Sequence, residues 1–108
     1  MVINIRTATG SADEVYIGRA GHGHDGYFGN PVAVNRSCPE CGHTHDRGGS
    51  TLRCYRDYLL RRLRTDTVFR AHVRDLNNKT LVCFCKPAPC HGDILAAAAA
   101  ALASGDAP

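Results

Sequence analysis

The clearest sign of an α/β architecture lies in residues 80–93, which read TLVCFCKPAPCHGD. The β-branched, apolar start of this stretch predicts a buried strand over residues 79–85. Two prolines then interrupt the strand, and the alanine-rich segment that follows predicts a helix from Asp93 to about Ala103. Junctions between a strand and a helix are common sites of function in α/β proteins. This junction also concentrates cysteine, histidine and aspartate side chains.

Two further strands are predicted near the N-terminus. Residues 2–6 alternate apolar and polar side chains, and residues 15–17 form a short apolar run before Gly18. Residues 20–50 are glycine- and histidine-rich without a regular period, which predicts a long irregular segment that needs an organising element.

Two amphipathic helices follow that segment. The first is predicted from Ser50 or Thr51, because apolar side chains then recur every three or four residues. The second is predicted from Thr65 or Asp66 for the same reason. The order strand, strand, helix, helix, strand, helix predicts an α/β fold with a small, mainly parallel sheet flanked by helices.

The length of 108 residues predicts one domain, over residues 1–103, with an insertion at about 36–54 and a flexible tail at 104–108. A net charge of +3 attracts anions weakly and is too small for a dedicated nucleic-acid coat. No signal peptide or membrane span is recognisable, so we expect a cytoplasmic protein without a membrane partner. In that reducing compartment the six cysteines are expected to be metal ligands or reactive thiols.

The segment Cys38-Pro39-Glu40-Cys41-Gly42 has the spacing of a zinc knuckle, in which both thiolates of a tight turn face one ion. Histidines follow closely, and a further cysteine lies at the start of the first predicted helix. The alternative is that this last cysteine is a small core residue and the knuckle cysteines are surface thiols. We predict one structural Zn²⁺ per chain, held by Cys38, Cys41, His45 and Cys54, with His43 as the substitute for His45.

Three interpretations of the cysteines in residues 83–93 stay open. In the first, the N-terminus of the last helix binds an anionic substrate, with Cys85 or Cys90 as nucleophile and His91 or Asp93 as proton carrier. In the second, Cys83, Cys85, Cys90 and His91 bind another metal ion. In the third, Cys85 and Cys90 form a redox pair. Cys83 is equally consistent with simple packing.

The motif C-x-C-x-P-x-P-C-H-G-D-x-L, from Cys83 to Leu95, resembles that of an uncharacterised α/β domain family, DUF4326, which is frequent in tailed phages and actinobacteria. The sequence VYIGR at residues 15–19, the motif FGNP at 28–31 and the helix containing YRDYL at 55–59 are similar to the family as well. The resemblance covers most of the chain and implies a fold and a site, but no reaction. It also marks the knuckle as an addition, since the family core often has a shorter loop without cysteines there.

The resemblance implies a site built from polar residues that are scattered along the chain. Two arginines and a helix N-terminus suit a phosphate or carboxylate, so a nucleotide-like or other small anionic ligand is expected. In simpler alternatives Arg19 pairs with Asp93, and Asn30 belongs to an ordinary turn. A phage origin would place the protein in the host cytoplasm. The implied ligand-binding residues are Asn4, Arg6, Arg19 and Asn30, and the implied catalytic residues are Cys85, Cys90, His91 and Asp93.

Three functions are therefore consistent with the sequence: an enzyme acting on an anionic metabolite, a protein that captures such a ligand without chemistry, and a zinc-stabilised adaptor for nucleic acid or protein. The adaptor depends on the arginines of the two predicted helices. Arg53, Asp57 and Arg61 are spaced four residues apart, which favours a solvated and internally paired face instead.

Overall fold

The computed structural model describes residues 1–21, 23–32, 35–46, 51–84 and 90–106. These residues form an α/β fold, as predicted. Its strands are β1 (Val2–Asn4), β2 (Glu14–Tyr16) and β3 (Thr80–Cys83), its helices are α1 (Leu52–Thr65), α2 (Thr67–Arg74) and α3 (His91–Ala103), and η1 (Ile5–Thr7) is a turn of 3-10 helix.

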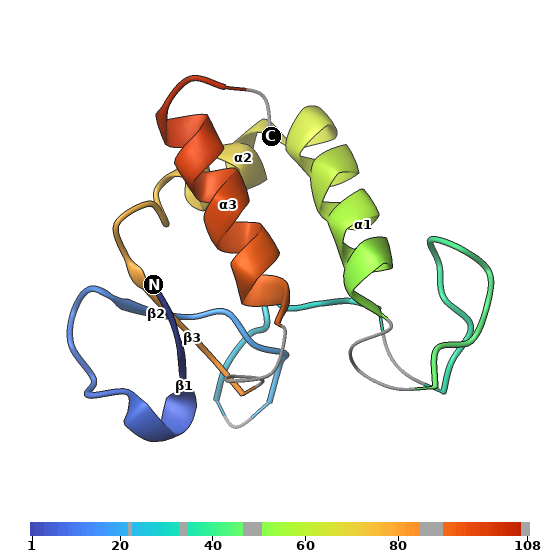
Figure 1. Ribbon diagram of the computed structural model, residues 1–108, viewed down its shortest axis with the longest axis horizontal. Coiled ribbons are helices and arrows are strands. Elements are labelled where there is room, and N and C mark those ends of the chain that lie inside the picture. The colour runs from blue at the N-terminus through green and yellow to red at the C-terminus, as the bar shows by residue number, and fades with distance from the viewer. Residues whose placement is uncertain (22, 33–34, 47–50, 85–89, 107–108) are drawn as a thin grey trace.

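The sheet is parallel, and its central strand is the last one in the sequence. Its order is β1-β3-β2, and Leu81 of β3 is in register with Val2 on one side and Val15 on the other. Because every strand runs the same way, the carboxyl ends of all three meet at one edge of the sheet. The start of α3, which follows β3, lies near this edge (Figure 1).

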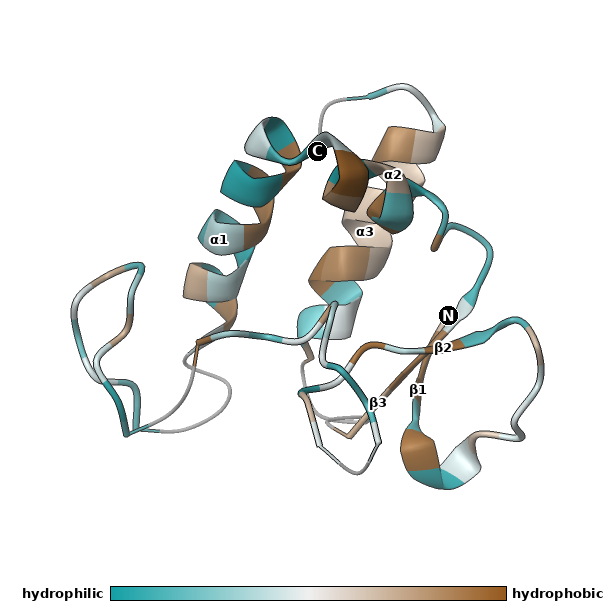
Figure 2. Ribbon diagram, turned by 180° about the vertical axis from the view of Figure 1, so that it is seen from behind, coloured by the Kyte–Doolittle hydropathy of each residue, from teal (hydrophilic) through white to brown (hydrophobic). Residues whose placement is uncertain are grey.

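The three helices lie together on one side of the sheet (Figure 1), and α3 contacts both β1 and β3. Helix α1 is hydrophilic on its outer side and hydrophobic toward α3 (Figure 2). This amphipathic pattern is the one that the three- and four-residue spacing predicts. The buried core between helices and sheet comprises Ile17, Tyr55, Leu59, Leu63, Phe69, Val73, Leu76, Leu81, Cys83, Cys90, Leu95, Ala98, Ala99 and Leu102.

Helix α2 begins where the sequence predicts it. Asp66 is the N-cap, and its Oδ1 accepts a hydrogen bond from the backbone N–H of Phe69 at 3.0 Å. The N-cap position of α1 is held by Thr51, whose side chain makes no capping hydrogen bond. Its hydroxyl oxygen instead accepts a hydrogen bond from Asn30. The other candidate cap, Ser50, lies outside the described residues.

The first and third strands are shorter than predicted. The strand predicted over residues 2–6 ends at Asn4, because the Asn4 Oδ1 accepts a hydrogen bond from the Arg6 N–H and turns the chain into η1. The last strand ends at Cys83 within the described residues, and residues 85–89 lie outside them. Helix α3 starts two residues earlier than predicted, at His91, because Cys90 caps it.

Candidate metal centre and sheet-edge site

The predicted knuckle forms a short hairpin beside the N-terminal end of α1 (Figure 1). Ser37 and Thr44 form an isolated antiparallel bridge, and the backbone N–H of Cys38 donates to the carbonyl of His43 at 2.8 Å. Gly42 has a φ of 78°, a conformation that other residues adopt at a cost. The turn therefore forces the two knuckle cysteines toward the same side.

The four predicted ligands come together in space. The sulfur atoms of Cys38, Cys41 and Cys54 and a ring nitrogen of His45 all lie within 4.8 Å of one another. Cys38 and Cys54 are buried, His45 is half-buried and Cys41 is exposed. Four donors at this separation are close enough to bind one metal ion. His43 is not part of the cluster, so the structure favours His45 over this alternative.

The thiols in this cluster have very different affinities for protons. Burial favours the neutral form of Cys38, but backbone N–H groups of Cys41 and Glu40 outweigh it and lower the Cys38 pKa to about 6. Burial raises the pKa of Cys54 to about 12, and the neighbouring thiols of Cys41 and Cys38 act in the same direction. Cys38 therefore supplies a thiolate readily, whereas Cys54 requires a cation to lose its proton.

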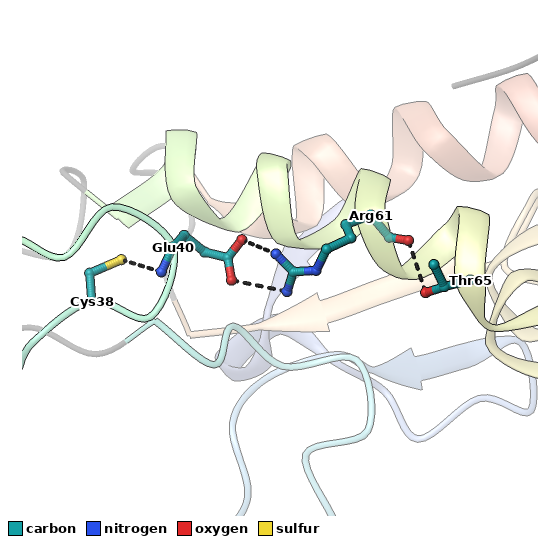
Figure 3. A network of polar contacts seen from close by, with 4 residues as sticks. All are labelled: Cys38, Glu40, Arg61 and Thr65. Carbon is teal, nitrogen blue, oxygen red and sulfur yellow. Dashed lines mark hydrogen bonds and ion pairs between the residues drawn. The ribbon is translucent and has the colours of Figure 1, made fainter.

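A polar network connects the knuckle to the outer side of α1 (Figure 3). The backbone N–H of Glu40 donates to Cys38 Sγ at 3.4 Å, and the Glu40 carboxylate binds the guanidinium of Arg61 through both oxygens. Arg61 thus pairs with the knuckle, not with Asp57 as the helical spacing suggested. The hairpin is held to α1 at two places, near Cys54 and at Arg61.

The second predicted site lies where β3 leads into α3. Cys90 is the N-cap of α3, and its Sγ accepts a hydrogen bond from the Gly92 N–H at 3.3 Å. Its own N–H donates to the Asp93 carboxylate, which completes a capping box. The sulfur atoms of Cys90 and Cys83 are 3.0 Å apart, and both side chains are buried. Asp93 is thus bonded to the cap and not to Arg19.

His91 is buried against the end of β2. Its Nε2–H donates to the carbonyl of Ile17 at 2.7 Å, and its ring packs edge-on against Tyr55. Burial lowers the His91 pKa below 6.5, and the nearby charge of Arg19 acts in the same direction against the opposing effects of the Ile17 carbonyl and Asp93. The ring is therefore neutral at pH 7, and its Nδ1 carries a lone pair.

The predicted ligand-binding residues divide into two groups. Arg19 and Asn30 belong together: the Arg19 guanidinium donates to the carbonyls of Asn30 and Val32 at 2.7 and 2.8 Å. The buried Asn30 side chain accepts from the Val32 N–H and donates to Thr51. Asn4 and Arg6 lie elsewhere, at the end of β1, where Asn4 Nδ2 donates to the carbonyl of Phe84. The predicted nucleophile Cys85 lies outside the described residues.

Arg19 and Asn30 line a pocket of about 370 Å³ between the glycine-rich segment and α1. Its other lining residues are Ala20, Gly26, Tyr27, Gly29, Pro31, Tyr58 and Arg62. Two arginines and two tyrosines thus face one hollow, and no aspartate or glutamate is among the residues that line it. The Arg62 guanidinium donates to the Tyr58 hydroxyl, lies 3.7 Å from the centre of the Phe69 ring, and contacts Asp66 at 3.5 Å.

The profile of DUF4326, a domain of unknown function, matches residues 3–101 of the chain. The chain belongs to the DUF4326 family. A curated relative, an uncharacterised 12.4 kDa protein in the nrdA-td intergenic region of Enterobacteria phage T4, is 36% identical over 47 residues. That alignment spans 44% of this chain and 44% of the relative, so less than half of either protein is compared. No solved structure matches.

In this DUF4326 protein the pocket also contains Tyr27, Tyr58 and Arg62, which were not predicted as site residues. The four-residue spacing of Tyr58 and Arg62 places both on one side of α1 and was a signal that could have found them. The arginines of α1 were instead expected to form a solvated face. Among the described residues, no helix has the length and apolar character that crossing a membrane requires.

Proposed function

We propose that this DUF4326 protein is a zinc-stabilised α/β domain that binds a small anionic molecule in the pocket lined by Arg19 and Arg62. The observation that carries the proposal is the lining itself, in which the described residues include two arginines and neither aspartate nor glutamate. A pocket of this kind favours a negatively charged ligand.

The bonding of Arg19 supports this proposal. Its guanidinium donates to two backbone carbonyls, which orient it without cancelling its charge. A guanidinium has five N–H donors in a planar fork, so donors remain for a phosphate or carboxylate. Arg62 is held against Phe69 and shares part of its charge with Asp66, and it therefore contributes less.

The remaining lining suggests the rest of the ligand. Tyr27 and Tyr58 supply aromatic surface. The hydroxyl of Tyr27 is already bonded to His72, that of Tyr58 accepts from Arg62, and the buried Asn30 amide holds the loop in place. The volume is near the lower end of the range of small-molecule sites, about 300–1,000 Å³. A mononucleotide-sized ligand, with one anionic group and one planar group, fits this description. The proposal is for binding; Cys90 and His91 are buried, and a processing step at them is not required by it.

A larger groove of about 490 Å³ lies between α1 and α3 but suits an anion less well. Its lining is mostly alanine, leucine and isoleucine, and it contains one arginine and one aspartate, Arg56 and Asp93. The acidic side chain offsets the basic one, which leaves no net attraction for a negative ligand.

The knuckle is proposed to hold Zn²⁺. Three sulfur atoms and one imidazole nitrogen are the donor set of structural zinc sites, and soft thiolates disfavour Mg²⁺ and Ca²⁺. Four protein ligands complete a tetrahedral shell, so the ion has a structural role. It would tie the hairpin of residues 35–46 to Cys54 on α1, where the hairpin has little apolar surface of its own to bury.

The zinc proposal is tested by native mass spectrometry of freshly purified protein. We expect one zinc per chain in the wild type and in His43→Ala, and its loss in His45→Ala. The two histidines lie in the same hairpin, which makes the first variant a matched control. Equal zinc content in both variants, or another metal in the wild type, would contradict the proposed ligand set.

The ligand proposal is tested by calorimetry with phosphate, mononucleotides and sugar phosphates, and with Arg62→Gln and Arg64→Gln variants. Both substitutions remove one charge from α1, but Arg64 does not line the pocket. We expect about tenfold weaker binding for Arg62→Gln and little change for Arg64→Gln. A panel without any binder would refute the proposal. Salt-sensitive binding of an oligonucleotide, weakened equally by both variants, would favour the adaptor.

A further inference from the structure

Cys83 and Cys90 form a contact that the proposed ligand and zinc sites do not use. Their sulfur atoms are 3.0 Å apart, and the side chains are 0% and 1% exposed. Cys83 is the last residue of the central strand and Cys90 caps α3. The end of the central strand and the start of the helix therefore hold two thiols next to each other.

Two neighbours of the buried Cys90 sulfur can assist the loss of its proton, which burial by itself opposes. The Gly92 N–H donates to Cys90 Sγ at the helix start, where unpaired backbone donors stabilise a negative charge. The His91 Nδ1 lies 3.8 Å from the same sulfur. Because Nε2–H is given to the Ile17 carbonyl, this Nδ1 presents a lone pair and can accept the thiol proton.

We propose that Cys83 and Cys90 constitute a reversible dithiol–disulfide centre, in which Cys90 attacks and Cys83 resolves. The two sulfur atoms need to approach by only about 1 Å to reach the length of a disulfide bond, about 2.05 Å. In this proposal the partner of Cys90 is Cys83, whereas the sequence suggested Cys85. Burial of both thiols restricts the oxidant to one of small size, such as hydrogen peroxide.

Hydrogen peroxide would oxidise the two thiols to a disulfide in two steps. The Cys90 thiolate attacks one peroxide oxygen, the O–O bond breaks, and the leaving hydroxide takes up a proton to become water. The resulting sulfenic acid is attacked by Cys83, the S–O bond breaks, and a second water leaves. Two thiols lose two electrons in total, and one peroxide is reduced to two waters. A dithiol reductant restores both cysteines by exchange.

The test is non-reducing peptide mapping after treatment of the zinc-loaded protein with hydrogen peroxide. Trypsin cleaves after Lys79 and not after Lys86, which precedes proline, so one peptide, residues 80–108, holds all three candidate cysteines and none of the knuckle. We expect this peptide to lose about 2 Da, the mass of two hydrogens, and to regain it with dithiothreitol.

Three single variants identify which two cysteines form the disulfide. The loss of about 2 Da should persist in Cys85→Ala and disappear in Cys83→Ala and Cys90→Ala. Absence of the loss in the wild type or in Cys85→Ala would overturn the proposal, and these two results do not depend on how well a core variant folds. Persistence in Cys83→Ala would assign the pair to Cys85 and Cys90. A second metal ion in the untreated protein that Cys90→Ala removes would also overturn it.

Discussion

The imidazole of His91 and the backbone carbonyl of Ile17 are joined by a hydrogen bond of 2.7 Å that spans 74 positions of the chain. The bond connects the first residue of α3 to the residue after β2, and the imidazole is almost completely buried. The carbonyl can only accept, so the ring must donate from Nε2. A buried, neutral histidine in this position makes the free energy of unfolding sensitive to pH.

We expect His91→Gln to make the protein less sensitive to mild acid. Burial lowers the His91 pKa in the folded state below its ordinary value of 6.5. The unfolded chain therefore takes up the proton first, and the wild type loses stability as the pH falls below about 6.5. Glutamine can donate to the Ile17 carbonyl but does not titrate in this range.

The measurement is urea unfolding of zinc-loaded wild type and His91→Gln between pH 7.5 and 5.5. Both proteins keep the Cys/His cluster unchanged, so acid effects on the proposed zinc site cancel in the difference. Parallel stability curves would show that His91 contributes nothing to the pH dependence. His91→Phe, which leaves the Ile17 carbonyl without this donor, should lose roughly 1–3 kcal/mol even at pH 7.5.

Gly92→Ala should destabilise the contact between α3 and the sheet. A Cβ at this position would lie 2.7 Å from Ile17 Cδ1 and 2.8 Å from Val2 Cγ1, closer than packed carbon atoms allow. Overpacking costs about 1–3 kcal/mol, and the better helix propensity of alanine offsets up to about 1 kcal/mol of this. Chemical unfolding measures the net loss.

A second substitution, at Ile17, tests whether the predicted clash causes the loss of stability in Gly92→Ala. Ile17→Val removes Cδ1, so the double variant with Gly92→Ala should be more stable than the sum of the two single losses predicts. Additive losses would mean that the new methyl group clashes with something other than Ile17.

Glu40→Gln should weaken the attachment of the hairpin to α1 without removing the proposed zinc ion. The Glu40 carboxylate binds Arg61 through both oxygens, but the Arg61 side chain is half exposed, so the loss of stability should be smaller than that for Gly92→Ala. The effect should shrink only partly in high salt, because the exposed Arg61 charge is screened whereas the Glu40 side chain is 8% exposed.

Asp75→Asn is the matched control for this substitution. Asp75 pairs with Arg74 at 3.8 Å on an exposed part of the chain, and its removal should have almost no effect. Thermal unfolding at low and high salt, together with zinc counting, separates the two variants. Loss of zinc from Glu40→Gln would show that the ion pair is needed to assemble the metal site.

Asp66→Ala should lower the unfolding temperature more than Asp66→Asn, because asparagine keeps an oxygen that can accept from the Phe69 N–H. The hydrogen bond from the Phe69 N–H and the nearby Arg62 lower the Asp66 pKa. The carboxylate contribution is thus fully present above the ordinary pKa of 3.8 and is lost as the pH falls through the lowered value. Equal melting temperatures for the two variants at pH 7 would contradict the capping role.

The features that the sequence revealed are those encoded locally. The periodicity of Leu59 and Leu63 marks one helix face, Asp66 is a typical N-cap, and two-residue spacing marks the knuckle of Cys38 and Cys41. Each depends on residues within one or two turns of the chain. Such patterns can be recognised in the sequence without knowledge of any tertiary contact.

The features that the sequence did not reveal depend on distant partners. Arg19 was predicted as a site residue, but its partners are the backbone carbonyls of Asn30 and Val32. Every residue has such a carbonyl, so the sequence does not show which ones bond to an arginine. Strand alternation groups Cys83 with Cys85, whereas the contact of Cys83 with Cys90 arises from how α3 docks on the sheet. Local patterns therefore say more about which residues are candidates for a site than about the partners of those residues.

The position of β3 in the sheet affects how the protein is made. Among the described strands, β1 and β2 have hydrogen-bonded neighbours only in β3, which is the last strand to leave the ribosome. A nascent chain that stops before Thr80 has two strands and no partner for either. The sheet can therefore assemble only after β3 has been made, from contacts that are far apart in the chain, and such contacts slow folding. Chains truncated before residue 80 should emerge as substrates for chaperones and proteases, not as stable folding intermediates.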